Sequence, residues 1–109
     1  MVEGTDRHVE ERFGLAPAAL ERIRAVFARH AEVRTVEVFG SRATGRFEDG
    51  SDVDLVLWGD LDAGLLGRIL AELDDLPLPY TFDVKAYETI DHPPLKRSID
   101  ETGKVLYGN

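Results

Sequence analysis

The most informative segment of the chain is Gly40-Ser-Arg-Ala-Thr-Gly-Arg-Phe-Glu-Asp-Gly-Ser-Asp-Val-Asp54, which joins two stretches typical of β-strands. Before it, Val33–Phe39 is rich in β-branched residues and is bounded by a glycine. At its end, Asp52–Trp58 is apolar apart from two aspartates and a terminal tryptophan. We therefore predict a strand, an irregular connection and a second, largely buried strand.

Two carboxylates, Asp52 and Asp54, stand two residues apart in the second strand. Because side chains alternate along a strand, both lie on one face, about 6.5–7 Å apart at their Cα atoms. Val53, Leu55 and Leu57 then point into the core. Two acids at the entrance of an apolar strand repel each other, so either their pKa values rise or a cation neutralises them. Oxygen-only ligands favour a hard cation, Mg²⁺ first.

The Asp-x-Asp spacing alone is weak evidence. The chain has 11 aspartates, so one pair at this spacing is expected by chance. A second pair, Asp60 and Asp62, falls in a turn where helix capping explains it. The strand around Asp52 and Asp54, and the segment before it, carry more weight.

Upstream of these acids, the predicted strand ends in Gly40-Ser41 and runs into a helical turn. Free backbone N–H groups, a serine hydroxyl and nearby arginines can hold phosphate groups. A P-loop is excluded because Arg46 and Phe47 replace its lysine and its serine or threonine. An EF-hand is excluded because Val56 occupies a ligand position. On its own, the segment is more typical of an ordinary glycine-containing turn than of a phosphate site.

The other periodic segments predict an α/β (α+β) fold, a small mixed β-sheet flanked by helices that pack on one side of it. The expected elements are a helix over Leu15–Ala31 with Pro17 in its first turn, a helix over Ala63–Asp74 capped by Asp62, a strand over Tyr80–Tyr87, a helix over Pro93–Thr102 and a short strand over Lys104–Tyr107. The residues expected to face the core from the two longer helices are Leu20, Ile23, Phe27 and Ala31, and Leu65, Leu66, Ile69, Leu70 and Leu73.

Composition limits the function. The chain has 109 residues, a net charge of −8 and no cysteine, which excludes disulfides and thiolate metal sites. The acidic balance opposes nonspecific binding of nucleic acid, and no apolar run is long enough for a membrane helix. We expect a cytoplasmic protein with one domain over residues 14–109, preceded by an N-terminal arm over residues 1–13.

Taken together, the motifs G-S-R-A-x-G from Gly40 and S-D-x-D-L from Ser51 resemble those of the minimal nucleotidyltransferases of the DNA polymerase beta superfamily, the MNT antitoxin type. The resemblance continues through Asp83 to a closing I-x-x-x-G-x-x-x-Y at Ile99, and it covers nearly all of residues 15–107. One departure is Thr44, where many relatives carry a basic residue.

This resemblance implies a polymerase-beta-like nucleotidyltransferase fold and a transfer of AMP from ATP. Asp52, Asp54 and Asp83 would be the catalytic residues and the ligands of two Mg²⁺ ions, with Asp83 accepting the proton of the attacking hydroxyl. The implied nucleotide-binding residues are Gly40, Ser41, Arg42, Arg46 and Ser51. Lys85 and Tyr87 share the strand face of Asp83 and either line the acceptor side or are simply exposed.

The resemblance further implies a partner, a small helical HEPN-domain ribonuclease toxin with which the chain forms a hetero-oligomer. The expected reaction is adenylylation of a tyrosine of that toxin, which would make the chain a protein adenylyltransferase and an antitoxin. Two alternatives stay open from the residues alone. The first is an antitoxin that neutralises by binding only, and the second is a nucleotidyltransferase acting on a small molecule.

Overall fold

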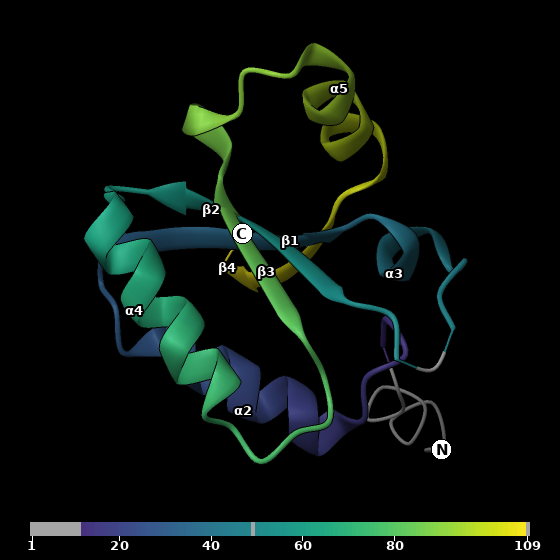
Figure 1. Cartoon of the computed structure of the whole chain (residues 1–109), viewed down its shortest axis with the longest axis vertical. Helices are drawn as coiled ribbons and strands as arrows, with labels where there is room; N and C mark the ends of the chain where they lie inside the picture. The colour runs from purple at the N-terminus through teal and green to yellow at the C-terminus, as the bar shows by residue number, and fades with distance from the viewer. Residues whose placement is uncertain (1–11, 49, 109) are drawn as a thin grey trace, which may run out of the picture.

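A four-stranded mixed sheet forms the centre of the molecule, in the order β3-β2-β1-β4 (Figure 1). The computed structural model describes residues 12–48 and 50–108. Strand β1 pairs antiparallel with β2 and with β4, whereas β2 and β3 are parallel. The strands are β1 Val33–Phe39, β2 Val53–Gly59, β3 Phe82–Ala86 and β4 Lys104–Gly108.

The helices agree with most of the sequence-based expectations. They are α2 Pro17–Ala28, α3 Ser41–Thr44, α4 Ala63–Asp74, the 3-10 turn η1 Tyr87–Thr89 and α5 Pro93–Thr102. The bounds predicted for α4 and α5 are confirmed, and so is the cap of α4, where the Asp62 carboxylate accepts a hydrogen bond from the Leu65 N–H at 2.8 Å. The irregular segment after Gly40 contains one short helix, as its helical turn predicts.

The first helix is shorter than its hydrophobic pattern predicts. Ala16 has an extended backbone, so α2 begins only at Pro17, whose missing N–H is harmless in a first turn. The helix ends at Ala28, and Ala31 is exposed in the turn that leads into β1. The prediction that Ala31 faces the core is therefore wrong, because the helical period stops before it reaches that residue. The strand predicted over Tyr80–Tyr87 is likewise shorter, since its last residue belongs to η1.

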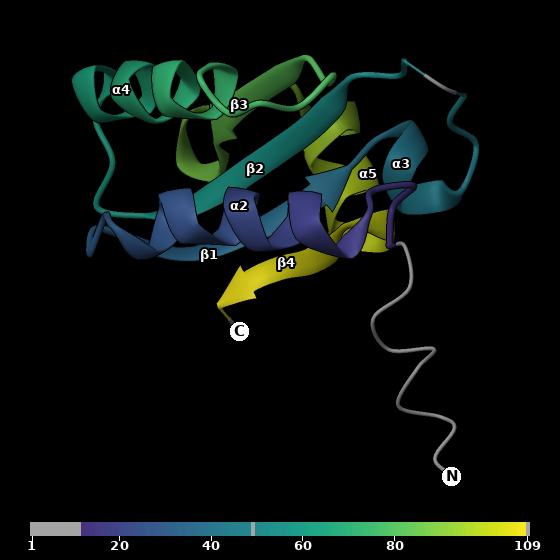
Figure 2. The same cartoon turned by 90° about the horizontal axis from the view of Figure 1, so that it is seen from below.

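The main hydrophobic core lies between one face of the sheet and helices α2 and α4. Val53, Leu55 and Leu57 of β2 point into it and are fully buried, as the alternation of the strand predicts. Figure 2 shows α2 and α4 side by side along this face. The other fully buried members are Leu15, Ile23, Val26, Phe27, Val36, Val38, Ile69 and Leu73.

The prediction that the helices cover one side of the sheet is wrong for α5. This helix lies across the sheet from α2 and α4 (Figure 1) and packs on the opposite face in a second, smaller core. That core consists of Phe39, Val56, Ile90 and Ile99, with Trp58, Tyr87 and Leu95 partly buried around it. Val56 is fully buried here, which gives β2 an apolar residue on both faces. The strand is therefore a central strand covered from both sides.

The strand directions bring three chain segments to one edge of the sheet. The carboxyl end of β1 lies beside the amino end of β2, because these strands are antiparallel. The amino end of β3 lies beside the same end of β2, because α4 provides the crossover that parallel strands need. The segment after Phe39, the start of β2 and the start of β3 therefore meet.

Residues 1–11 of the predicted N-terminal arm lie outside the described residues. Arg12–Leu15, which spans the end of the predicted arm and the start of the predicted domain, forms a tight turn in which the two end residues exchange backbone hydrogen bonds at 2.8 and 3.1 Å. Leu15 is fully buried and Phe13 packs against the main core. Among the described residues, no helix has both the length and the apolar character to cross a membrane.

Glu37 lies on the sheet face under α5, and its pKa is raised, first by burial and then by the charge of Asp100. Its carboxylate approaches Gly103 so closely that a Cβ there would overlap it. We expect Glu37→Gln to raise the melting temperature at pH 7 by roughly 2–4 °C. The variant removes a charge whose burial destabilises the folded chain, and solvent screening reduces this destabilisation to about 0.5 kcal/mol.

This gain depends on pH with a defined sign. The charged form of Glu37 is disfavoured more in the folded than in the unfolded chain, so the penalty is full at pH 7. It vanishes as the pH falls through the raised pKa to values at which the carboxyl group is protonated in both states. Thermal melts from pH 7 to pH 4 test this, with Glu21→Gln on the exposed face of α2 as the control. A gain that grows toward low pH would contradict the assignment.

Candidate active site

The segment after β1 lies directly against the second strand. Gly40 has a φ of 75° and a ψ of −152°, a conformation that L side chains rarely adopt. A Cβ at this position would lie 2.7 Å from Oδ2 of Asp54. Only glycine allows the chain to pass this close to the carboxylate, so the Gly40 backbone and Asp54 form one wall of the site.

Helix α3 begins immediately after this glycine, as the sequence predicts. In this short helix the N–H groups of Ala43 and Thr44 donate to the Gly40 carbonyl at 3.1 and 3.3 Å, which leaves those of Ser41 and Arg42 as the candidates for binding an anion. The helix closes quickly, because Gly45 follows it with a left-handed φ of 82° and the Arg46 N–H donates to the Ser41 carbonyl at 2.9 Å. We call Gly40–Gly45 the phosphate turn.

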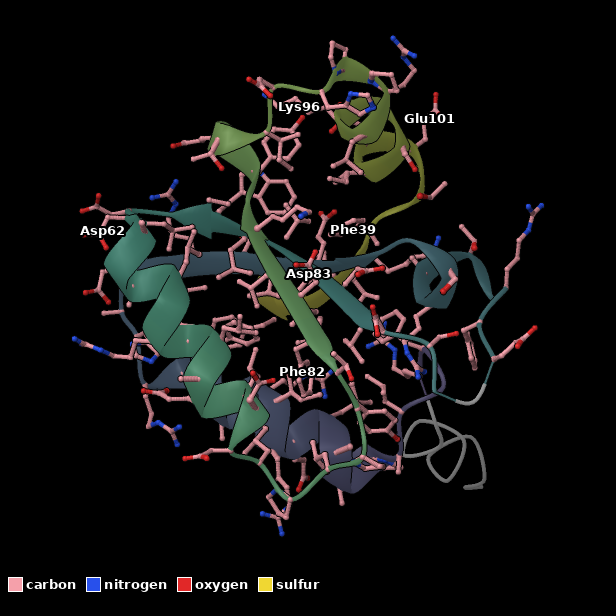
Figure 3. All side chains as sticks on the ribbon, in the orientation of Figure 1. Phe39, Asp62, Phe82, Asp83, Lys96 and Glu101 are labelled. Carbon is pink, nitrogen blue, oxygen red and sulfur yellow. The ribbon has the colours of Figure 1, made fainter. Side chains whose placement is uncertain are left out.

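Asp54, which is part of this wall, has a second acid beside it in the sheet. Phe39, Asp54 and Asp83 form one row across three strands, since the first pairs with the second and the second with the third in register. Neighbouring strands are about 4.8 Å apart, so the two carboxylates are adjacent. Figure 3 labels Phe39 and Asp83, the two ends of this row. The sequence alone placed Asp83 on an alternating strand without fixing its neighbour.

The electrostatics of this row centre on Asp54. Burial raises the pKa of Asp54, and the charges of Asp83 and Asp52 raise it further. Lys85 and Arg42 act in the opposite direction. In the metal-free protein the like charges therefore repel one another, as the Asp-x-Asp pattern predicts. A cation at this position would relieve the repulsion.

Lys85 supplies part of that positive charge. Its Nζ lies 3.1 Å from Oδ2 of Asp83, and both side chains are about half exposed. The residue was predicted to share the face of Asp83, and this placement is confirmed, whereas the ion pair was not foreseen. A lysine two residues from an aspartate on a strand is the signal that would have indicated it, because both side chains point the same way.

Asp52 stands just before β2 and is exposed. Within residues 12–48 and 50–108, no three histidine or acidic side chains are close enough together to hold a metal ion. The chemistry of the site nevertheless fits a divalent cation, because Asp54 and Asp83 are adjacent, repel each other and offer only oxygen ligands. The metal ligation predicted for Asp52, Asp54 and Asp83 stays a prediction.

The predicted nucleotide-binding residues fall into two groups. Gly40, Ser41 and Arg46 lie on or beside the phosphate turn, and the Arg46 side chain is exposed. Arg42 and Ser51 instead bind each other, because the guanidinium donates from Nε and Nη2 to the Ser51 carbonyl at 3.1 and 2.8 Å. The Ser51 hydroxyl also accepts a hydrogen bond from the Glu48 N–H at 2.8 Å.

The structure therefore gives Arg42 partners other than those that the sequence suggests. Its side chain is only 3% exposed, and its third nitrogen donates to the Phe13 carbonyl at 2.8 Å. Every guanidinium nitrogen thus has a backbone partner, which leaves Arg46, exposed and directly after the phosphate turn, as the arginine available to a phosphate. No sequence pattern marked Arg42 as buried, because arginines are rarely so.

Trp58 lies on the same face of β2 as Asp54 and packs in the second core. Its ring stacks on Tyr87 with centroids 4.8 Å apart. Tyr87 in turn donates a hydrogen bond from its hydroxyl to Asp100 at 2.8 Å, and Lys96 Nζ lies 4.8 Å from the centre of its ring. The two aromatic residues therefore join β2 and η1 to α5.

A glycine turn that touches an acidic strand, with a second acid on the neighbouring strand, defines a site for phosphoryl chemistry on a nucleotide. Comparison with known proteins agrees. Residues 21–109 match the family described as Polymerase beta, Nucleotidyltransferase, and the chain belongs to that family. The resemblance drawn from the sequence motifs and the predicted fold class are thereby confirmed. No curated protein matches the sequence.

Solved structures share the fold at low sequence identity. A toxin–antitoxin complex with AMP-PNP matches with a TM-score of 0.69 and 19% identity, over 83% of this chain and 73% of the other. A complex of the tri-AMPylated HEPN toxin of Shewanella oneidensis with its MNT antitoxin matches with a TM-score of 0.63 and 17% identity, over 84% and 71%.

The raised pKa of Asp54 gives a prediction for the metal-free protein. Asp54→Asn removes a negative charge that burial and the neighbouring acids disfavour, and it keeps the shape of the side chain. We therefore expect this variant to melt roughly 2–4 °C above the wild type in EDTA at pH 7. The matched control is Asp60→Asn, an exposed acid outside the site, which leaves the melting temperature unchanged. A lower melting temperature for the Asp54 variant would mean that its carboxylate stabilises the fold.

Proposed function

We propose that this protein is an antitoxin that acts as a Mg²⁺-dependent protein adenylyltransferase and transfers AMP from ATP to a tyrosine hydroxyl of a HEPN-domain ribonuclease toxin. The observation that carries this proposal is the contact between Gly40 and Asp54, with Asp83 next in the same row. It brings a turn suited to phosphate groups against carboxylates suited to a hard cation. Membership of the nucleotidyltransferase family supports the reaction class.

The relatives support the acceptor and the nucleotide. One solved structure with the same fold is a complex of an MNT antitoxin with a tri-AMPylated HEPN toxin. Another is a toxin–antitoxin complex with AMP-PNP. The net charge of −8 adds a physical argument, because a ribonuclease is basic near its RNA site. Opposite charges speed the encounter of two proteins and make its rate fall with salt.

In the proposed reaction, the phosphate turn holds the β- and γ-phosphates. The N–H groups of Ser41 and Arg42 and the Ser41 hydroxyl donate to phosphate oxygens, and Arg46 adds positive charge. Asp52, Asp54 and Asp83 would hold Mg²⁺, which neutralises phosphate charge and lowers the pKa of the attacking hydroxyl. Arg42 contributes through its field at Asp54 rather than by direct contact.

The bond changes balance without a further reactant. The tyrosine oxygen forms a bond to the α-phosphorus, the bond from that phosphorus to the oxygen bridging to the β-phosphate breaks, and pyrophosphate leaves. Asp83 accepts the phenolic proton. Before it does so, its Oδ2 must release the ammonium group of Lys85. The pair is half exposed, so this exchange costs little.

The first test concerns the ligands. We expect ATP to bind in the presence of Mg²⁺ and to lose most of its affinity in EDTA, because the carboxylates at Asp54 and Asp83 repel the phosphates unless a cation lies between them. Calorimetric titration measures this directly. At about 100 times the Kd, Mg²⁺ and ATP together should stabilise the fold by about 2.7 kcal/mol. Equal affinity in EDTA would refute the metal requirement.

The second test concerns the acceptor. When the chain is co-expressed with its HEPN partner, we expect intact-mass spectrometry to find one or more AMP increments on the partner, with the modified residue a tyrosine. Asp54→Asn should abolish the increments, and Asp60→Asn should leave them unchanged. The modification places a phosphate charge beside an RNA-binding surface, which blocks it by repulsion and by bulk.

Two outcomes would decide for the alternatives. An unmodified toxin that the Asp54 variant still neutralises fully would favour an antitoxin that acts by binding alone. Transfer of AMP to a small molecule, with the toxin unmodified and active, would favour a small-molecule nucleotidyltransferase.

A further inference from the structure

Arg42 is the one buried charged residue of the described part of the chain. Its guanidinium donates to two backbone carbonyls that lie far apart in the sequence, those of Phe13 and Ser51. The planar group also packs between two rings, with its carbon 5.1 Å from the centre of Phe47 and 5.2 Å from that of Tyr80. We call Arg42 and these four partners the arginine latch.

The latch joins the two halves of the candidate site. Arg42 follows Ser41 in the phosphate turn, and Ser51 immediately precedes Asp52. The guanidinium therefore fixes Ser51, and with it Asp52, relative to the phosphate turn, whereas strand pairing fixes Asp54. A cavity of 390 Å³ lies beside this loop and is lined in part by Arg42, Phe47, Glu48, Gly50 and Tyr80, so the loop is not closely packed on that side.

The far end of the latch lies before the region that matches the family. Residues 12–15 precede residue 21, where that match begins. Phe13, whose carbonyl accepts from Arg42, has a φ of 59°, which is unfavourable for a phenylalanine. Gly14 follows with a φ of 72°, and a Cβ there would lie 2.8 Å from Nη1 of Arg42 and would overlap the Phe47 ring. The turn is thus shaped to cover the guanidinium.

Burying an arginine is costly unless its donors find acceptors, and here three of its five N–H groups, one on each nitrogen, donate to a carbonyl. Lysine cannot replace it, because an ammonium group lacks the planar fork that reaches two carbonyls in opposite directions. A stability role alone would be served by an apolar side chain of similar volume. The planar guanidinium instead holds the Ser51 and Phe13 carbonyls at fixed positions relative to the phosphate turn.

We propose that Arg42 is a positioning residue for Mg²⁺ and nucleotide binding, and that the turn at residues 12–15 is a working part of the site because it holds the guanidinium in place. This inference rests on the proposed nucleotidyl transfer. Arg42 acts through Ser51, which sets the position of Asp52 relative to the phosphate turn.

The test compares Arg42→Lys with Arg24→Lys. Arg24 is a matched control, since its Nε also donates to a backbone carbonyl, that of Leu106 at 2.8 Å, and thereby joins α2 to β4 away from the site. We expect both variants to lower the melting temperature. Only Arg42→Lys should raise the Mg²⁺ concentration required for half-maximal ATP binding, by about 10–100-fold, the loss typical when a residue that orients metal ligands is removed.

A second readout needs no ligand. The Ser51 N–H donates to the Glu48 carbonyl at 2.9 Å, so its exchange with solvent reports on the loop before Asp52. Arg42→Lys should speed this exchange and leave the Asp60 N–H, which donates to Glu32 at 3.0 Å, as protected as in the Arg24 variant. Phe47→Leu removes one ring from the latch and offers a milder variant if Arg42→Lys fails to fold, with the same direction expected in both readouts.

An unchanged Mg²⁺ requirement in the latch variants, with a melting temperature lowered as in Arg24→Lys, would overturn the proposal and make Arg42 purely structural. Neither readout depends on the acceptor. If the wild type binds Mg²⁺ and ATP but transfers no AMP to a toxin, the proposed function fails while the latch is still tested.

Discussion

The Gly40 backbone lies against the carboxylate of Asp54, and the arrangement of the site depends on this contact. It requires β1 and β2 to be antiparallel neighbours with Phe39 opposite Asp54, and it requires that position 40 carry no side chain. Because the two partners stand on paired strands, their spacing is set by sheet geometry rather than by a loop. The phosphate turn and the acidic strand therefore behave as a preorganised unit, which limits the cost of ordering them when a nucleotide binds.

The acids of this unit are balanced by cations that approach from two directions. Lys85 comes from the same strand as Asp83 and is half exposed, so it can exchange with another cation. Arg42 is buried behind the phosphate turn and cannot leave without freeing three donors. One cation is thus replaceable and the other is permanent. This difference would suit the proposed reaction, in which a divalent ion joins the acids only when the nucleotide binds.

The two faces of the sheet have different tasks. Helices α2 and α4 cover one face with the larger core, which provides most of the buried apolar surface. On the other face, α5 and η1 cover Val56 and Phe39, and the row of Asp54 and Asp83 lies at the border of this smaller core. Burial and the like charges of Asp83 and Asp52 raise the pKa of Asp54.

The sequence by itself determined the local features. Val33–Phe39, Ala63–Asp74 and Pro93–Thr102 were predicted with their bounds because β-branching, an aspartate cap and proline are signals that act within a few residues. Strand alternation likewise fixed the face of Asp54, whereas Asp52, predicted in the same strand, lies just before β2.

Only the tertiary structure decided what lies beside these residues. The pairing of Asp54 with Asp83 depends on the register of β2 and β3, which the packing of α4 sets. The side of the sheet that α5 covers depends on its connections, and no periodicity encodes it. Arg42 reads in the sequence as a free phosphate ligand, yet its partner Phe13 is 29 residues away. Contacts at such separations are selected by the burial and hydrogen bonding of the whole chain, and local residue patterns contain no information about them.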